Sequence, residues 1–218
     1  MKLCCISDYH SQFRQIPPSS FEPHDVTVFT GDWTGPRAPL LARAATLDFL
    51  EWLSRLPSRH QVFIAGNHDR TPVDDPVGFR QMVAQYPSII YLENESTTID
   101  NFVFYGSPYT PPFFDWYFMT PESELLRMYA SVPANTAVLL THGPAFGILD
   151  ETDRGVSAGS LSLAALLSNL PSLRLHVFGH IHEAYGTKTL DSYTAVNASQ
   201  LDSLYRIQPT PIYINLQE

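Results

Sequence analysis

Seven side chains that could bind metal ions follow short apolar stretches of the sequence. Those stretches end in Ser7-Asp8-Tyr9-His10, Gly31-Asp32, Gly66-Asn67-His68-Asp69, Thr141-His142-Gly143 and Gly179-His180-Ile181-His182. Two carboxylates, one amide oxygen and four imidazoles are costly to gather unless a charged centre binds them. Seven ligands are too many for one ion, whereas a bridging carboxylate lets two ions lie about 3.5–4 Å apart, a separation suited to clamping a phosphoryl group. The residues therefore predict a site for two divalent metal ions, with the ligands Asp8, His10, Asp32, Asn67, His142, His180 and His182.

The ligand types also indicate which metals the site binds and which kind of molecule it attracts. Mixed nitrogen and oxygen ligands favour manganese, iron, zinc or cobalt over magnesium or calcium alone. We expect manganese first, with iron, zinc, cobalt or magnesium as alternatives. Asp8 and Asp32 offset two of the four positive charges, and a bridging hydroxide a third, so the site would attract a phosphate.

These side chains can meet only if the strands that carry them lie side by side. Apolar, β-branched runs predict strands at Lys2–Ser7, Asp25–Thr30, Gln61–Ala65, Ile89–Leu92, Phe102–Tyr105, Ala137–Thr141, Leu173–Phe178, Tyr193–Asn197 and Ile212–Leu216. Strands alternate with helices early and are denser later, which predicts an α/β fold with more than one sheet. In such folds ligands gather outside the carboxyl ends of strands, so five such ends can surround one point.

The clearest helical pattern lies between the second and third predicted strands. Apolar residues recur there every three or four positions, at Leu40, Ala44, Leu47, Leu50, Leu53 and Leu56, with Pro39 near the start and Pro57 after the end. This spacing predicts an amphipathic helix of about five turns. Weaker helical patterns occupy Gly78–Gln85, Glu122–Ala130 and Leu161–Asn169.

Composition excludes several classes of partner. The chain has 218 residues, of which 44% are hydrophobic, and this fits a single domain, residues 1–218. A net charge of -9 leaves no basic surface for a long nucleic acid, although small phosphorylated molecules remain possible partners. No apolar run approaches the length of a membrane span or a secretory signal. Cys4 and Cys5 are adjacent and cannot form an ordinary disulfide framework, so we expect a cytoplasmic protein.

In their order, the five motifs resemble the signature of calcineurin-like metallophosphoesterases. The resemblance spans positions 8 to 182 and implies a four-layer αββα sandwich of two mixed β-sheets flanked by helices. It further implies that Asp8, His10 and His182 hold one metal, that Asn67, His142 and His180 hold the other, and that Asp32 bridges both.

The same resemblance implies a mechanism. A hydroxide that bridges the metals attacks phosphorus, while His68 contacts the phosphate and protonates the leaving group. Asp69 belongs with His68 in the catalytic set and would hold neighbouring loop structure or orient a histidine.

A closer resemblance, to the metallophosphoesterase-domain-containing subgroup, covers much of the chain. It is carried by Ile-Ala-Gly-Asn-His (64–68), Thr-His-Gly-Pro (141–144), His-Val-Phe-Gly-His-Ile-His-Glu (176–183) and Val-Asn-Ala-Ser (196–199). The subgroup implies a phosphodiesterase for small diesters, including cyclic ones and nucleotides, and purine nucleotide binding. Both His180 and His182 are present, which favours an active enzyme. A phosphomonoesterase and a metal- and nucleotide-binding regulatory or scaffold protein with weak turnover are the alternatives.

One departure argues against a phosphoprotein substrate. Ser/Thr phosphatases of the superfamily continue the second motif as Gly-Asp-x-x-Asp-Arg-Gly, whereas this chain reads Gly31-Asp32-Trp33-Thr34-Gly35-Pro36-Arg37. The Asp-Arg pair is missing, although Arg37 could reach the site from another direction.

Residues outside the motifs have less specific interpretations. The aromatic segment Tyr109–Phe118 predicts a loop or lid, whose rings either stack a nucleobase or pack the loop down. Candidate substrate contacts are Asn67, His68, Tyr109 and Asn197. Asn197 and Ser199 either line the rim of the site or satisfy a turn. Surface loops are expected for His24 and His60, a strand for His176, and a solvated loop charge for Arg154. The oligomeric state is left open.

Overall fold

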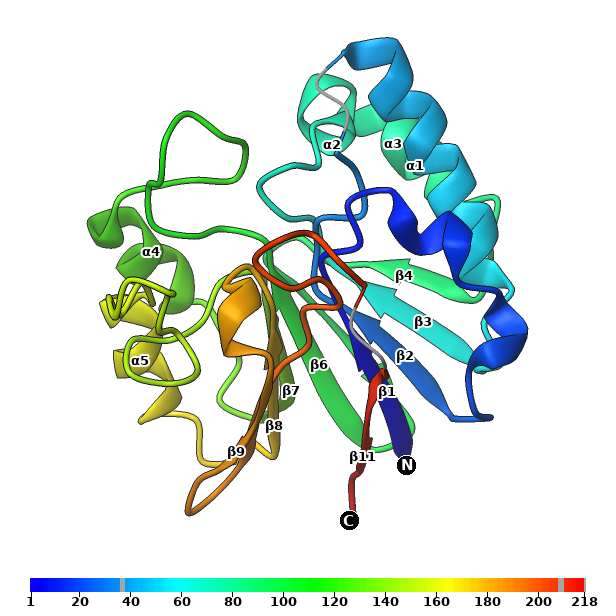
Figure 1. Ribbon diagram of the computed structural model, residues 1–218. Helices are drawn as coiled ribbons and strands as arrows, with labels where there is room; N and C mark the ends of the chain where they lie inside the picture. Colours follow the sequence, from blue (N-terminus) through cyan, green and yellow to red (C-terminus); the bar gives the residue numbers. More distant parts are fainter. Residues whose placement is uncertain (36–37, 208–209, 218) are drawn as a thin grey trace.

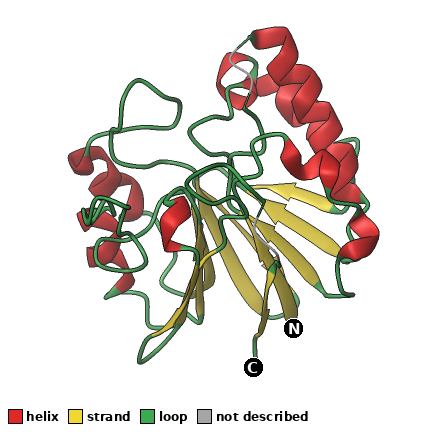
Figure 2. Ribbon diagram, in the orientation of Figure 1, coloured by secondary structure: helices red, strands yellow, loops and turns green. Residues whose placement is uncertain are grey.

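Two mixed β-sheets form the centre of the molecule in the computed structural model, which describes residues 1–35, 38–207 and 210–217 (Figures 1 and 2). The first sheet has the order β11-β1-β2-β3-β4. Its parallel members are β1 (Lys2–Ile6), β2 (Val26–Phe29), β3 (His60–Phe63) and β4 (Ile89–Tyr91), and β11 (Ile212–Asn215) pairs antiparallel with β1. The chain termini are close together, since the amino group of Met1 donates to the carbonyl of Leu216 at 2.9 Å.

The second sheet has the order β5-β6-β7-β8-β10-β9. Its inner strands are parallel: β6 (Phe102–Ser107), β7 (Thr136–Thr141), β8 (Leu175–Phe178) and β10 (Thr194–Asn197). The edge strands β5 (Glu95–Ile99) and β9 (Gly186–Thr189) are antiparallel to their neighbours.

Every strand predicted from the sequence is present within one or two residues, but β5 and β9 were not predicted. They read ESTTI and GTKT, and most of their residues are exposed or half-buried. A polar edge strand carries little apolar pattern, and polar residues at an edge discourage pairing with other chains.

Helices cover the outer faces of both sheets. Figure 1 shows α1 (Pro39–Ser54), α2 (Thr71–Asp74) and α3 (Pro76–Val83) beside the first sheet, and α4 (Glu122–Tyr129) and α5 (Leu161–Leu167) beside the second. Short 3-10 helices lie at Gln12–Gln15, Pro18–Ser20 and His182–Ala184. In the described part of the chain, no helix is long and apolar enough to cross a membrane.

Alternation along the strands builds three separate hydrophobic layers. Cys4 and Ile6 of β1 face the cluster that contains α1 and α3, whereas Leu3 and Cys5 face a cluster shared by the two sheets. Tyr105 and residues of α4 and α5 form the third cluster. Helix, sheet, sheet and helix are therefore stacked as four layers, which confirms the expected αββα sandwich.

The buried face of α1 agrees with the predicted one at Leu50 and Leu53 but differs from it earlier in the helix. Leu40 is 83% exposed and Leu47 is 39% exposed, and Ala44 is also exposed. The buried residues of the helix are Ala42, Ala45, Thr46, Phe49, Leu50, Trp52 and Leu53. The leucine spacing misplaced the first half of the stripe, because Phe49 packs against Phe29 of β2 and Phe63 of β3, while Trp52 packs against Phe13 and Phe21.

Two histidine predictions also need correction. His24 is buried rather than in an exposed loop, and its ring nitrogens lie 2.7 Å from the carbonyl of Glu22 and 2.7 Å from the Thr27 hydroxyl. His60 is the half-buried first residue of β3. Cys4 and Cys5 are free and buried, and burial raises the pKa of Cys4 to about 12.

Candidate metal centre

The carboxyl ends of β1, β2 and β3 in the first sheet and of β7 and β8 in the second lie at the same end of the sandwich. The predicted ligands follow these ends. The backbone N–H of Asp8 donates to the carbonyl of Gly31 at 2.9 Å, and the N–H of Gly179 donates to the backbone carbonyl of His142 at 2.9 Å. A further bridge joins Ser7 to Ser199 across the two sheets. These short links between loop segments fix the positions of residues that are far apart in sequence.

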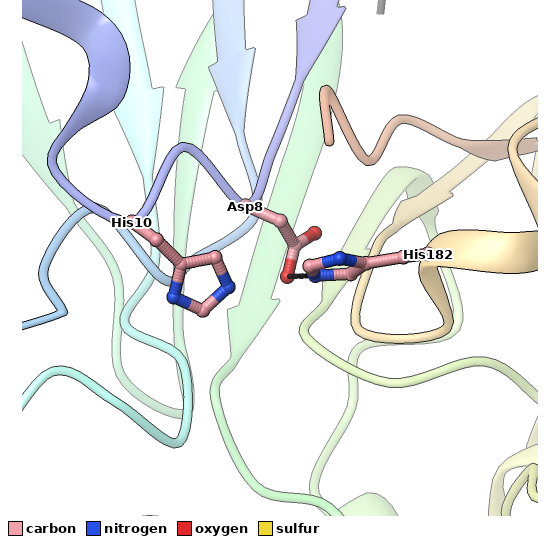
Figure 3. Close-up of side chains that lie close together, drawn as sticks. All are labelled: Asp8, His10 and His182. Carbon is pink, nitrogen blue, oxygen red and sulfur yellow. Dashed lines mark ion pairs between the residues drawn. The ribbon is translucent and has the colours of Figure 1, made fainter. Parts of the chain in front are cut away.

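Asp8, His10 and His182 form the first group that could hold a metal ion (Figure 3). One ligand atom from each lies within 4.8 Å of the others, and His182 Nε2 is 3.6 Å from Asp8 Oδ1. His10 Nε2 is buried and has no hydrogen-bond partner in the described part of the structure. A buried nitrogen without a partner, beside two carboxylates, fits a metal ligand.

Asp32 is the shared member of two further groups, Asp8-Asp32-His142 and His10-Asp32-His68. Its Oδ2 lies 3.4 Å from His142 Nε2 and 3.7 Å from His10 Nε2. Asn67 Oδ1 is 2.8 Å from His142 Nε2. His180 belongs to none of the three groups among the described residues, but its ring is 4.9 Å from that of His142. All seven predicted residues therefore converge, with Asp32 in the middle.

Hydrogen bonds behind the site orient two of the imidazoles. Nδ1 of His142 lies 2.8 Å from the carbonyl of Thr30, and Nδ1 of His182 lies 3.2 Å from the carbonyl of Asp202. When Nδ1 donates its proton to a carbonyl, Nε2 is left to face a metal. The backbone thus selects the tautomer that metal binding requires.

The backbone is strained where it carries the site. Asp8, His10, Asp32 and His180 all have positive φ, of 54°, 43°, 59° and 68°. Few residues other than glycine adopt this region, at a cost on the order of 1 kcal/mol each. Strain in four of the seven residues indicates that the surrounding structure imposes these side-chain directions.

Two glycines allow the carboxylates to sit where they do. A Cβ built on Gly179 would overlap Oδ2 of Asp8, and one built on Gly66 would overlap Oδ1 of Asp32. Any side chain at these positions would displace a carboxylate, so glycine is a steric requirement at both positions.

Burial and neighbouring charges together set the pKa values within the site. Burial lowers the pKa of His142, but Asp32 and Asp8 outweigh burial and raise it to about 9. Burial lowers the pKa of His10 to about 4 and that of His180 to about 3. Burial opposes ionisation of Asp32, yet the histidines lower its pKa well below the usual range. Without a metal, the ionised carboxylates therefore favour protonation of His142 and His182, whose pKa values are raised, whereas burial keeps His10 and His180 neutral. A metal ion would take the place of the protons on His142 and His182.

Asp69 lies behind the site and binds backbone. Its Oδ2 accepts from the N–H groups of Asp32 and Gly66 at 2.7 and 2.9 Å, and its Oδ1 accepts from the N–H of Thr34 at 2.9 Å. These contacts tie the loop after β2 to the loop after β3, which positions Asp32.

His68, a member of the His10-Asp32-His68 group, lies at the rim of the site and also lines an open cavity beside it. Its backbone N–H donates to Asp32 Oδ1 at 2.7 Å, and its ring packs against that of Trp116 with centroids 4.2 Å apart. The sequence pointed to the aromatic segment as a whole but did not single out Trp116.

The turn at Asp202–Arg206 was missed altogether. The Tyr205 ring lies 5.1 Å from His10 and 5.2 Å from His182, and its φ is 58°. Asp202 accepts from the N–H groups of Leu204 and Arg206, and its carbonyl faces His182. Tyr205 follows no predicted strand, so nothing in the sequence places it at the site. The spacing of Asp202 and Arg206, which is typical of a turn, is the only local signal of this segment.

Other candidates lie away from the site. Tyr109 packs against Phe118 and lines none of the cavities around the metal-capable groups. Asn197 is buried, and its Nδ2 donates to the carbonyl of Ile181 at 2.8 Å while its Oδ1 accepts from the N–H of Ser199. Its amide thus supports the loop of the last motif. Arg154 is exposed, and Arg37 lies outside the described residues.

The segment after Asp32 is anchored in the core. Trp33 is fully buried, stacks between Phe49 and Phe79 at 5.1 and 5.9 Å, and donates through Nε1 to the Thr46 hydroxyl. Trp33 thus directs this loop toward α1 and α3.

Comparison with known proteins agrees with this geometry. The calcineurin-like phosphoesterase family model matches residues 1–184. The human and mouse metallophosphoesterase domain-containing protein 1 are each 31% identical over 99% of this chain and 71% of their own length. In fold, the chain resembles a Thermus thermophilus protein (TM-score 0.62, 13% identity, 90% and 88% of the two chains). It also resembles a Danio rerio dimetal phosphatase (TM-score 0.50, 11% identity, 94% and 88%). The chain belongs to the calcineurin-like phosphoesterase family.

Proposed function

We propose that this protein is a dinuclear-metal-dependent phosphodiesterase for small phosphodiesters, cyclic or nucleotide ones included. The observation that carries the proposal is the convergence of two buried carboxylates, Asp8 and Asp32, with four imidazoles, and Asp32 belongs to two of the three metal-capable groups among the described residues. In the proposed assignment Asp8, His10 and His182 would hold one ion, Asn67, His142 and His180 would hold the other, and Asp32 would be shared by both. The resemblance to the Danio rerio dimetal phosphatase supports two ions. Manganese is the metal that we expect for both ions.

The chain's own residues have separate tasks. Two bound divalent ions would supply positive charge for the phosphate and acidify a water molecule. His68 would hold a proton toward the oxygen of the leaving group, since imidazole is the usual donor near neutral pH. Trp116 packs on one side of that ring and limits its rotation. Asp69 keeps Asp32 and the His68 backbone in register through the loop contacts described above.

Several finer points belong to the same proposal. We propose that residues 1–218 are one domain, because one hydrophobic cluster includes both sheets and residues from Leu3 to Leu216. A cytoplasmic location fits two free, buried cysteines. A small phosphorylated substrate fits the net charge of -9 better than a long nucleic acid does.

Turnover of model esters tests the proposal. Purified protein with Mn²⁺ is expected to hydrolyse bis-p-nitrophenyl phosphate faster than p-nitrophenyl phosphate. Asn67→Ala should lose metal and activity together, whereas His68→Ala should keep its metal and lose about 100-fold in rate. Asn169→Ala, at an exposed residue after α5, is the matched control.

Two results would favour the alternatives. A faster rate on the monoester would indicate a phosphomonoesterase. Nucleotide binding with no turnover of either ester would indicate a regulatory protein.

A further inference from the structure

A hollow lined by His10, Asp32, Asn67, His180 and His182, which we call the metal-site hollow, has two cavities beside it. Among the described residues, these two cavities share no lining residue with each other. We call the first the His68 cavity; it has a volume of about 790 Å³ and includes His68, Arg70 and Trp116 in its lining. The second, the proline cavity, has a volume of about 360 Å³ and includes His180. His68 and His180 both also line the hollow itself, so each cavity continues from a different part of the site.

Two phenylalanines of the loop after β6 separate the cavities. Phe113 lines the proline cavity and the hollow, whereas Phe114 lines the His68 cavity and the hollow. Their rings lie 4.5 Å apart, edge to face. A phosphate in the hollow would therefore have one route outward on each side of this pair.

The walls of the proline cavity are mostly apolar and stiff. Six of its lining residues are Pro111, Pro112, Phe113, Pro144, Ala158 and Ile181. Proline fixes its backbone φ, so the cavity is largely formed before a ligand arrives. No Lys or Arg is among the described residues of its lining, and its acidic member is Glu183. Such a lining favours an uncharged apolar group and disfavours an anionic one.

The two cavities differ in their access to a proton donor. His68 lines only the larger one, and a departing alcohol needs the proton that His68 would supply. We propose that the leaving group of a phosphodiester departs through the His68 cavity, while the proline cavity binds the alcohol group that stays on phosphorus, an aryl or alkyl group without charge. This inference rests on the proposed function. A diester has such a retained substituent, whereas a monoester has none.

A pair of diesters tests the subsite through the retained group alone. Manganese-loaded protein is assayed on phenyl p-nitrophenyl phosphate and methyl p-nitrophenyl phosphate, which share a leaving group. Burial of the phenyl ring is expected to raise kcat/KM about tenfold over methyl. Ala158→Phe, which fills the cavity, should reduce that preference to about twofold or less. Ala165→Phe, the same change in a separate groove between α4 and α5, should keep the wild-type preference.

Binding of phosphonates gives a readout without turnover. Calorimetry on the manganese-loaded protein is expected to show phenylphosphonate binding about tenfold more tightly than methylphosphonate. The difference should disappear in Ala158→Phe and persist in Ala165→Phe. A third variant, Glu183→Gln, is tested by turnover. It should raise kcat/KM for a p-nitrophenyl diester with a carboxymethyl retained group about threefold, since one like charge is removed from the cavity.

The outcomes separate the two proposals. If Ala158→Phe hydrolyses diesters with the wild-type phenyl preference and retains the phosphonate difference, the subsite is overturned and the phosphodiesterase proposal stands. If the wild-type protein hydrolyses neither ester and binds neither phosphonate, both proposals fall.

Discussion

The metal centre and the loop above it differ in how firmly the structure holds them. At the metal centre, Asp8 and His142 are fully buried, and backbone links between neighbouring strand ends fix the chain. In the loop after β6, Phe113 and Phe114 are 59% and 81% exposed. The buried region sets the chemistry, which leaves little freedom for change. The exposed region shapes the cavities beside it, so it can vary with the substrate.

The largest expected effect comes from the carboxylate at the centre. Asp32→Asn keeps the shape of the side chain but removes its charge, so a bound metal pair would lose its shared ligand. We expect metal content to fall and kcat/KM to drop at least about 100-fold, because even indirect ligand contacts are worth 10–100-fold. Metal analysis and esterase assays measure both.

Asp48→Asn is the matched control, because Asp48 is exposed and pairs with Arg14. Full metal content and wild-type activity in Asp32→Asn would contradict the central position of this carboxylate.

The next effect tests whether the glycines are a steric requirement. Gly179→Ala places a Cβ against Asp8 and Ser7 and is expected to lower the free energy of unfolding by about 1–3 kcal/mol. Gly35→Ala has its nearest atom at 3.5 Å and should change stability by less than about 0.5 kcal/mol. Urea unfolding compares the two variants. Equal stability would mean that the strand ends have more room than their geometry indicates.

A smaller effect is expected where the two regions touch. Trp116→Ala removes the ring that packs on His68, so kcat should fall about three- to tenfold, within the range that one proton donor contributes. Metal content should stay unchanged, because Trp116 belongs to none of the metal-capable groups among the described residues. A parallel loss of metal would show that the loop supports the buried site as well.

The smallest effect is a pH dependence beneath the metal centre. Burial lowers the pKa of His176 to about 3, and its Nε2 lies 2.8 Å from the Thr141 hydroxyl. The unfolded chain takes up a proton near pH 6.5 that the folded chain refuses, so stability falls as the pH drops from about 6.5 toward 3. His176→Gln should reduce the slope of the free energy of unfolding against pH by at most about 1.4 kcal/mol per pH unit. Urea unfolding at pH 5.5 and 6.5 measures it; an unchanged slope would contradict a neutral buried His176.

The same contrast explains what the sequence could predict. Apolar runs located the strands, and a small residue before each polar motif marked where a strand ends, so the seven metal-capable residues were found together. Edge strand β9 has no apolar residue and β5 has only Ile99, so neither shows a strand pattern and both were missed. Part of the face predicted for α1 was wrong, because leucine spacing does not show that Phe49 contacts the strands.

Residues that act through tertiary contact left little local signal. Tyr205 reaches the rings of His10 and His182 from a turn near the end of the chain. Asn197 was expected with equal weight at the rim or in a turn, and its hydrogen bonds show the structural role. Such roles depend on how loops pack, which neither periodicity nor motif spacing encodes.

A crystal structure of the protein grown with Mn²⁺, with anomalous scattering recorded, would show whether two ions share Asp32. Two peaks about 3.5–4 Å apart are expected. Asp32 should contact both, with Asp8, His10 and His182 around one and Asn67, His142 and His180 around the other. A single peak, or peaks away from Asp32, would contradict this arrangement.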